Sequence, residues 1–189
     1  QQFKKNKGKL YKKYFSIQEQ GVIKEIFKKA SKKETSNILN YKSLKNLKFI
    51  EFPKSGLKEI KRIVKKILEL KGCLLLIDYG YIKPNNQNTL QSVMRHKKNN
   101  FLENLGNAGI TSHVNFKLLN EFFKKNNLKT KSVISQQKFL KKMGIIERAE
   151  IIAKKMKFKE QSNLYLRLRR LLSPNLMGEM FKVILAYKS

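Results

Sequence analysis

The stretch GCLLLIDYGY, residues 72–81, decides the fold class that the sequence predicts. Apolar residues follow the first glycine without polar alternation, and the run ends on Asp78, two tyrosines and Gly80. It is too short to span a bilayer, which takes about 20 apolar residues. A strand in a parallel α/β sheet is covered by helices on both faces and needs no alternation. A short buried helix is the competing interpretation, but the bracketing glycines favour a buried strand. Its end, DYGY, is then a loop at the ligand-binding edge of the sheet.

A helix is predicted directly before this strand. Residues 54–72 read KSGLKEIKRIVKKILELKG, in which apolar residues recur at helical spacing. Ser55 is placed to cap the start of the helix and Gly72 to end it. The helix leads into the strand, so the two form an αβ unit with Asp78 at its end.

The remaining chain alternates further predicted strands and helices. Residues 9–17 and 47–52 indicate two exposed strands. The stretch after Tyr81 is rich in Asn, Gln, Lys and Gly, which is typical of a long functional or mobile loop. Beyond it the pattern predicts a helix capped by Thr111, a strand over 128–134, a helix from Ser135 through Met143, helices over 146–158 and 161–172, and a strand over 181–187. This order predicts a layered α/β sheet rather than a helix bundle.

The charge of the chain invites a nucleic-acid interpretation. The 189 residues include 43 Lys and Arg and carry a net charge of +30, and a dense basic surface binds phosphate backbones. However, the basic residues are spread along the whole length, only six are arginine, and they accompany 17 Asn and 17 Ile. A+T-rich codons produce this joint excess without any ligand. We therefore expect no dedicated nucleic-acid surface.

Few residues are available for a disulfide or a metal site. Cys73 is the only cysteine, so we expect a buried, inert thiol in a reducing compartment. His96 and His113 have no nearby Cys or Asp partner, so no metal site is predicted. The N-terminus shows no charged start followed by an apolar stretch and a cleavage site, so neither secretion nor membrane insertion is indicated.

With these elements in place, the chain resembles the MidA-like S-adenosylmethionine-dependent methyltransferases, which include the mitochondrial enzyme acting in assembly of respiratory complex I. Five runs carry the resemblance, in family order: LLLIDYGY at 74–81, TLQSVMRHK at 89–97, ITSHVNF at 110–116, SQQKFLKKMGI at 135–145 and LLSPNLMGEMFKV at 171–183. They imply an α/β fold, the C-terminal part of a class I, Rossmann-like methyltransferase sheet with flanking helices.

The resemblance also implies one partial domain over residues 1–189, the C-terminal half of a methyltransferase domain. Its strands are weakly matched over 1–53, and the αβ core with the family motifs covers 54–189. In the family, a glycine-rich turn after the first strand and an acidic residue after the second hold the cofactor. Neither element is found here. S-adenosyl-L-methionine is therefore the expected cofactor, with its main binding elements absent from this chain.

The motifs nominate candidate residues of a substrate or cofactor pocket: Asp78, Tyr79, Gly80, Tyr81, His96, Thr111, His113 and Asn115. Asp78 could orient a ligand or cap a loop by accepting backbone N–H bonds, and the tyrosines could wall the pocket or pack under helices. Gly80 is expected to be a turn residue that tolerates positive φ. His96 could contact substrate or lie solvated in a loop, and His113 is expected near a helix start in a neutral, hydrogen-bonding form. Catalytic residues stay unassigned.

Two positions depart from the family pattern. Family members resemble one another in having an acidic residue at the position of Gly109. They also favour the sequence HVDF where this chain has HVNF, so Asn115 stands in place of the aspartate. An arginine guanidinium needs acceptors that orient it, so lost carboxylates bear on activity. The remaining carboxylate candidates are Asp78 and, further upstream, Glu51.

The resemblance implies the C-terminal portion of an enzyme that methylates an arginine of a partner protein, such as a complex I subunit. The alternative is a non-catalytic assembly or interaction module with a decayed methyltransferase fold, which Gly109 and Asn115 support. The expected partners are a protein substrate and, through an uncovered strand edge, further copies of the chain. The RLRR run at 167–170 is typical of a solvated helix face and could meet an acidic partner. The implied compartment is the bacterial cytoplasm or, in a eukaryote, the mitochondrial matrix.

Overall fold

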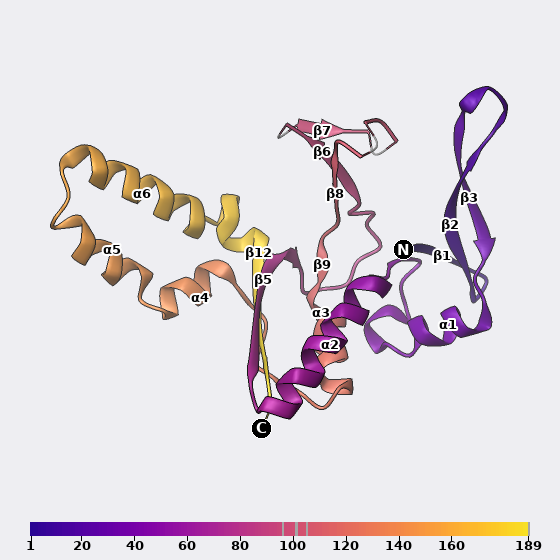
Figure 1. The fold of residues 1–189 in the computed structure, drawn as a ribbon, viewed down its shortest axis with the longest axis horizontal. Helices are drawn as coiled ribbons and strands as arrows, with labels where there is room; N and C mark the ends of the chain where they lie inside the picture. The colour runs from indigo at the N-terminus through magenta and orange to yellow at the C-terminus, as the bar shows by residue number, and fades with distance from the viewer. Residues whose placement is uncertain (96, 101, 105, 189) are drawn as a thin grey trace.

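The computed structural model describes residues 1–189 except residues 96, 101, 105 and 189 and the side chain of Gln20. A central sheet carries helices on one side and extends three arms (Figure 1). In chain order the elements are β1 Gln2–Asn6, β2 Lys9–Ile17, η1 Glu19–Gly21, β3 Ile23–Lys29, α1 Lys32–Leu39, η2 Lys42–Leu44, β4 Phe49–Glu51, α2 Lys54–Leu70, β5 Cys73–Tyr81, β6 Gln91–Met94, β7 Lys97–Asn99, β8 Gly109–Thr111, β9 Val114–Asn115, α3 Phe116–Lys125, β10 Lys129–Thr130, β11 Ile134–Ser135, α4 Gln136–Lys142, α5 Ile145–Ala153, α6 Phe158–Leu172, η3 Pro174–Gly178 and β12 Phe181–Tyr187.

The central sheet is built around β5 and β12. These strands pair antiparallel over Cys73–Tyr79, and β10 and β11 pair with the other edge of β12. The short strand β9 runs parallel to β5 and pairs with it only at Gly80 and Tyr81. The predicted strand over 72–81 is therefore confirmed. The expectation that its end is a loop is wrong, because pairing with β9 keeps DYGY in the strand.

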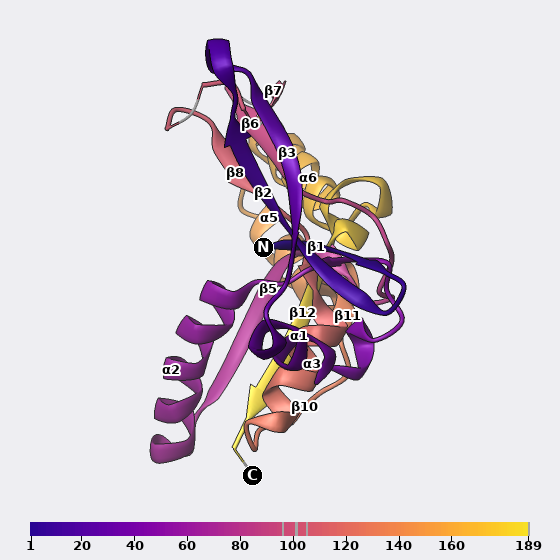
Figure 2. The same cartoon turned by 90° about the vertical axis from the view of Figure 1, so that its right-hand side faces the viewer.

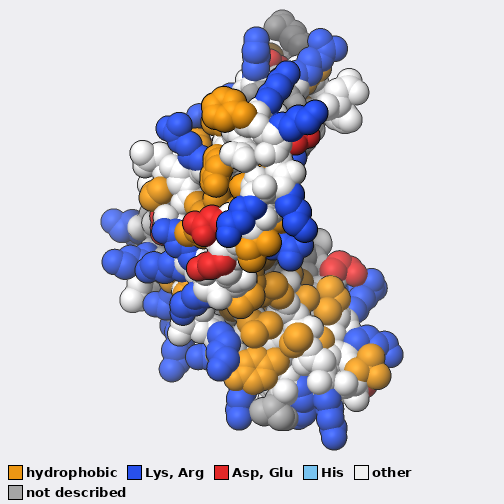
Figure 3. All heavy atoms as spheres, turned by 90° about the vertical axis from the view of Figure 1, so that its left-hand side faces the viewer, with side chains coloured by type: hydrophobic (Ala, Val, Ile, Leu, Met, Phe, Trp, Pro, Cys, Tyr) orange, Lys and Arg blue, Asp and Glu red, His pale blue; other side chains and the backbone are white. Residues whose placement is uncertain are grey.

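The expectation that β5 is buried on both faces is also wrong. Leu74 and Leu76 pack into the core, whereas Leu75 and Ile77 are 44% and 42% exposed. Cys73 is exposed as well, not buried. Side chains alternate along a strand, and α2 and α3 both cover the same face (Figure 2). The other face looks toward the viewer in the lower half of Figure 3, where hydrophobic side chains gather at the surface.

The described strands also leave one edge of β5 open. From Cys73 to Tyr79 its second edge pairs with none of the strands in the described part of the chain. An unpaired row of backbone N–H and C=O groups is a template for another strand. The open edge and the uncovered face therefore belong to the same strand.

One contiguous cluster of buried residues joins α2, α3, the central sheet and the N-terminal strands. The apolar side of α2, with Val64 at its centre, and that of α3, with Phe116 and Phe123, pack on Ile184 of β12. The cluster continues into the N-terminal sheet, whose strand order is β3-β2-β1-β4, through Phe3. The N-terminal strands therefore share a core with the αβ unit.

Most of the predicted elements are present, with some changed boundaries. The strands expected at 9–17 and 47–52 are β2 and β4, while the strand expected over 128–134 is divided into β10 and β11. The segment expected to be irregular contains the antiparallel sheet β7-β6-β8. Ser135 caps α4 as expected, but α2 follows Pro53 without a cap from Ser55. Within the described residues, no helix is both long enough and apolar enough to cross a membrane.

Thr111 does not cap a helix. It lies at the end of β8, and α3 starts at Phe116. Asn115 is the capping residue, because its Oδ1 accepts a hydrogen bond from the N–H of Leu118 at 3.0 Å. Asparagine is among the residues best suited to this position.

Candidate functional site

A cavity of about 280 Å³ lies where the ends of β4 and β5 meet the first turn of α2 and the segment 112–116. Small-molecule sites span about 300–1,000 Å³, so this cavity is just below that range. Asp78, Glu51, His113 and Asn115 supply polar groups to its lining, and apolar residues of α2 and α3 form much of the rest. The cavity can therefore hold a side chain or another small group.

Asp78 lies in β5 and carries the most available carboxylate of the cavity. Its Oδ1 accepts a hydrogen bond from the N–H of Tyr79 at 2.8 Å, and its side chain is otherwise exposed. Lys182 stands directly opposite on β12, but its Nζ forms an ion pair with Glu179 at 3.6 Å. Among the described residues Asp78 has no salt bridge, so its second oxygen is free to accept from a ligand.

Glu51, at the end of β4, is held by the chain itself. Its Oε1 accepts from Gln2 Nε2 at 2.9 Å and from the N–H of Thr89 at 3.1 Å, and the Thr89 hydroxyl donates to its Oε2. Thr89 Oγ1 in turn accepts from the N–H of His113 at 3.0 Å. Glu51 therefore joins β1, β4 and the segment that carries His113.

The segment after β5 is fastened to the N-terminal sheet by asparagines. Asn86 Oδ1 accepts from the N–H groups of Lys48 and Phe49, at 2.6 and 3.2 Å. Asn88 Oδ1 accepts from Gln2 Nε2 at 2.6 Å and from the N–H of Leu90 at 3.1 Å. Asn86 thus satisfies backbone donors at the start of β4, and Asn88 satisfies that of Leu90, all of which would otherwise need water. They also place Thr89 beside Glu51.

An aromatic cluster joins β5 and β12 to the His113 segment, and of its three rings only that of His113 lines the cavity. The ring of Tyr79 meets His113 edge to face, with ring centroids 5.4 Å apart, and meets Phe181 at 5.7 Å. Such edge-to-face pairs stabilise a fixed ring arrangement. Tyr79 and His113, separated by the whole β6–β8 arm in sequence, are thus brought together, but Tyr79 does not line the cavity.

Tyr81 and Asn115 lie side by side, and of the two only Asn115 lines the cavity. They pair in register between β5 and β9. Burial raises the pKa of Tyr81 to about 12, helped by the negative charge of Glu51 and opposed by a side-chain hydrogen bond with Asn115. The Tyr81 phenol is consequently neutral at physiological pH. The Asn115 side chain is engaged by Tyr81 and by the capped helix, so it serves the structure of the site.

Gly80 is required for a reason that differs from the expected one. Its φ is not positive, so the expectation of a turn residue is wrong. A Cβ at this position would lie 2.1 Å from the carbonyl oxygen of Val114. Only a glycine lets β9 approach β5 closely enough to pair, and this pairing brings His113 and Asn115 to the cavity.

The other predicted site residues lie elsewhere. Thr111 belongs to β8, and its buried Oγ1 has no hydrogen-bond partner in the described part of the chain. Gly109 also lies in β8, outside the cavity lining. His96 falls outside the described residues. No group of three or more His, Cys, Asp or Glu able to hold a metal ion occurs among the residues described.

Sequence reasoning missed the role of Gln2, Asn88 and Thr89, and it named Glu51 only as a further carboxylate candidate upstream. The available signal was positional, because Glu51 ends a predicted strand as Asp78 does. Ligands in α/β folds bind beyond the carboxyl ends of strands. Polar residues next to such ends are therefore candidates even when they are distant in sequence.

The comparisons with known proteins decide the family. A family model described as putative S-adenosyl-L-methionine-dependent methyltransferase matches residues 1–134. The chain belongs to this methyltransferase family. Among curated proteins it is 30% identical, over 109 residues, to the mitochondrial protein arginine methyltransferase NDUFAF7 homolog of Caenorhabditis elegans. That alignment covers 58% of this chain and 25% of the worm protein.

Two solved structures from Burkholderia thailandensis share the fold of this family member. Both are 19% identical to it, with TM-scores of 0.82 and 0.80, and the second is bound to S-adenosyl-homocysteine. The matches cover 99% of this chain but 51% and 49% of the other chains. The predicted methyltransferase fold is thereby confirmed, and the chain spans about half the length of these structures.

Proposed function

We propose that this chain supplies the methyl-acceptor side of an S-adenosylmethionine-dependent methyltransferase, which acts on an arginine side chain of a partner protein. The observation that carries the proposal is the small cavity at the end of β5, with the available Asp78 carboxylate at its mouth. The family supports the reaction class, and the name of the worm relative supports arginine as acceptor.

The residues present fit an acceptor better than they fit the cofactor. A cavity of about 280 Å³ is small for a whole nucleoside-containing ligand. None of the described turns next to it is rich in glycine, and Gly56 is its single glycine among the described lining residues. We infer that the glycine-rich turn and the ribose-binding acid lie in the remaining half of the fold. That half would extend the sheet from the open edge of β5 and cover Leu75 and Ile77.

Asp78 is the residue best placed to hold the acceptor. Carboxylates bind a planar guanidinium with two parallel hydrogen bonds, and guanidinium planes stack on aromatic rings. Asp78 offers an oxygen that the chain does not use, and the ring of His113 lines the same cavity. Glu51 is held by three donors of the chain, so its role is to position the His113 segment.

The bound cofactor supplies a methyl group on a positively charged sulfur. Transfer breaks the C–S bond, leaves its electron pair on sulfur, forms an N–C bond to the guanidinium and releases one N–H proton. Asp78 aligns the accepting nitrogen and draws its proton toward solvent through a hydrogen bond. Orientation of this kind is a large part of catalysis when the reaction needs only in-line approach.

The departures at Gly109 and Asn115 do not favour the non-catalytic alternative. Asn115 caps α3 and hydrogen-bonds Tyr81, so its amide has a structural role. Gly109 is exposed in β8 and does not line the cavity.

The test uses the protein expressed from its complete natural reading frame, mixed with S-adenosylmethionine and an extract of cells that lack it. Methylarginine in proteins of the extract is quantified by mass spectrometry. We expect Asp78→Asn to reduce it at least tenfold while the fold is kept, because Asn retains the acceptor for the N–H of Tyr79. Glu19→Gln, an exposed change near the β2–β3 turn, serves as the control and should have no effect.

Methylation confined to another residue type, or unchanged methylation by Asp78→Asn, contradicts the proposal. No methylation by the wild type supports the assembly-module alternative.

A further inference from the structure

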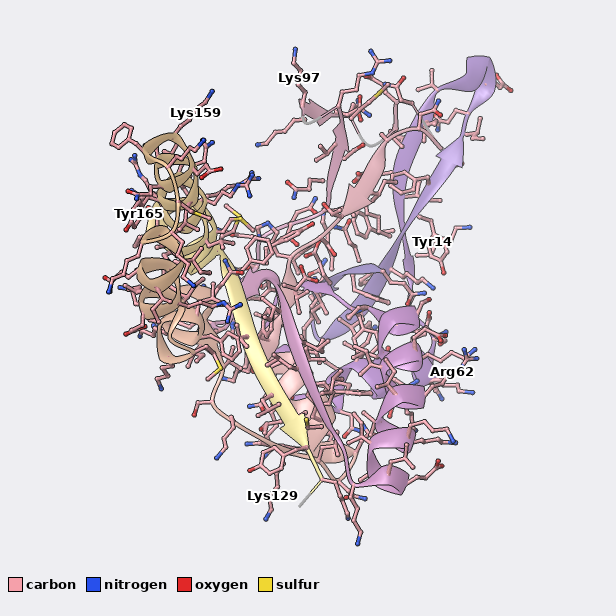
Figure 4. The ribbon with its side chains drawn as sticks, turned by 60° about the vertical axis from the view of Figure 1, so that its left-hand side comes forward. Tyr14, Arg62, Lys97, Lys129, Lys159 and Tyr165 are labelled. Carbon is pink, nitrogen blue, oxygen red and sulfur yellow. The ribbon has the colours of Figure 1, made fainter. Side chains whose placement is uncertain are left out.

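The outer face of α6 carries an apolar stripe. Phe158, Tyr165 and Leu166 are 85%, 46% and 61% exposed. They are seven and eight positions apart, so they lie on one side of the helix. Figure 4 shows Tyr165 and the neighbouring Lys159 directed away from the sheet. The opposite side of α6 packs against α4, α5 and η3, so the outer stripe is not needed for the fold of the arm.

Basic side chains lie close to this stripe, because Arg169 and Arg170 are three and four positions from Leu166 and Lys159 is seven positions from it. Lys159, Arg167, Arg169 and Arg170 are all exposed, and none forms an ion pair within the described residues. The one acid of the helix, Glu160, accepts a hydrogen bond from the N–H of Lys157 at 2.9 Å as part of the helix cap. Charge on this face is therefore of one sign.

The arginines distinguish this face of α6 from the rest of the chain, whose basic residues are mostly lysines. Lysines occur throughout, as A+T-rich codons favour, but only six arginines exist and three of them lie within residues 167–170. Arginine, tyrosine and phenylalanine are enriched at protein interfaces, and arginine suits interfacial ion pairs. The combination on α6 is therefore typical of a contact surface.

We infer that the outer face of α6 docks an acidic, amphipathic helical segment of a partner protein. The 15 residues of α6 extend over about 22 Å, which matches a partner helix of about four turns. An apolar stripe on the partner would cover Phe158, Tyr165 and Leu166, and its acids would meet the arginines. This is the helix-in-groove form of recognition.

Charge and topology argue against other occupants. A second copy of the chain also carries +30, so two α6 faces repel each other. The further half of the sheet proposed above would extend from the open edge of β5, and β12, to which α6 leads, pairs with the opposite edge. Completion of the sheet therefore proceeds away from α6.

The test measures fluorescence anisotropy of a labelled peptide of about 18 residues, with Leu at helical spacing and Glu at the other positions. Its control has the same composition in scrambled order. We expect saturable, salt-sensitive binding of the patterned peptide and at least tenfold weaker binding of the scrambled one. Phe158→Ser with Leu166→Ser, and Arg169→Glu with Arg170→Glu, should each weaken binding at least tenfold.

Matched variants on α2 make the result specific. Ile63→Ser with Leu70→Ser, and Lys58→Glu with Lys61→Glu, change exposed helix residues and alter polarity and net charge in the same way. They should change the affinity less than twofold, and circular dichroism should show that all variants are folded. Equal losses from the α2 variants, or no preference for the patterned peptide, overturn the inference. Phosphatidylserine vesicles that bind through α6 while the peptide does not would also overturn it, in favour of a lipid surface.

Discussion

At the scale of single residues, the candidate site depends on how closely the backbone of β9 approaches that of β5. Gly80 lets β9 come against the end of β5, and Tyr81 and Asn115 then pair across the two strands. Asp78 sits two residues before this contact and receives an N–H bond from Tyr79. The geometry of the acceptor site thus depends on one position that bears no functional group.

Gly80→Ala tests this dependence. The new Cβ would lie 2.1 Å from the Val114 carbonyl oxygen, a backbone atom that cannot rotate away. We expect the free energy of unfolding, measured with urea, to fall by about 1–3 kcal/mol, as for other overpacked sites. Gly72→Ala is the control, because a Cβ there meets nothing within 4 Å. An unchanged midpoint for Gly80→Ala would show that β9 does not pack as described.

At the scale of elements, the Asn115 cap connects the strand register to α3. Its Oδ1 accepts from the N–H of Leu118, and helix α3 then presents Phe116 and Phe123 to the core. A cap at this point fixes where the helix begins. It therefore fixes where His113 stands relative to Asp78.

Asn115→Ala removes the cap, and Asn115→Asp keeps the oxygen acceptor. We expect Asn115→Ala to lower the free energy of unfolding by about 1–2 kcal/mol, as loss of a cap does elsewhere. Asn115→Asp should lower the free energy of unfolding less, because the carboxylate oxygen still accepts from the N–H of Leu118. Chemical denaturation of both variants measures the difference. Equal losses would show that the hydrogen bond to Tyr81, rather than the cap, is the important contact.

The elements were predictable where the sequence pattern is local. The helical spacing over 54–72 and the apolar run before Asp78 gave α2 and β5. The one-sided burial of β5 was not predictable, because it depends on which helices lie over Leu75 and Ile77. The Glu51 network was also hidden, since its bonds to Thr89 link residues 38 positions apart. Thr111 was predicted to cap the helix because of its residue type. Thr111 instead ends β8, and Asn115, directly before α3, is the capping residue.

At the scale of the whole molecule, the chain is folded around one core yet leaves a sheet incomplete. One edge of β5 is open within the described residues, and exposed apolar side chains lie on the face beside it. Its structural relatives are about twice as long. We interpret the chain as the acceptor side of a methyltransferase, which needs a second half to hold the cofactor.

Calorimetric titration of S-adenosyl-homocysteine into residues 1–189, and in parallel into the protein from the complete natural reading frame, tests this interpretation most directly. We expect no saturable heat with residues 1–189 alone, and saturable binding by any longer protein that adds the missing strands. Asp78→Asn in that longer protein should leave the affinity for S-adenosyl-homocysteine within twofold, because Asp78 is assigned to the acceptor. Micromolar binding by residues 1–189 alone would contradict the account, since the cofactor site would then lie within this chain.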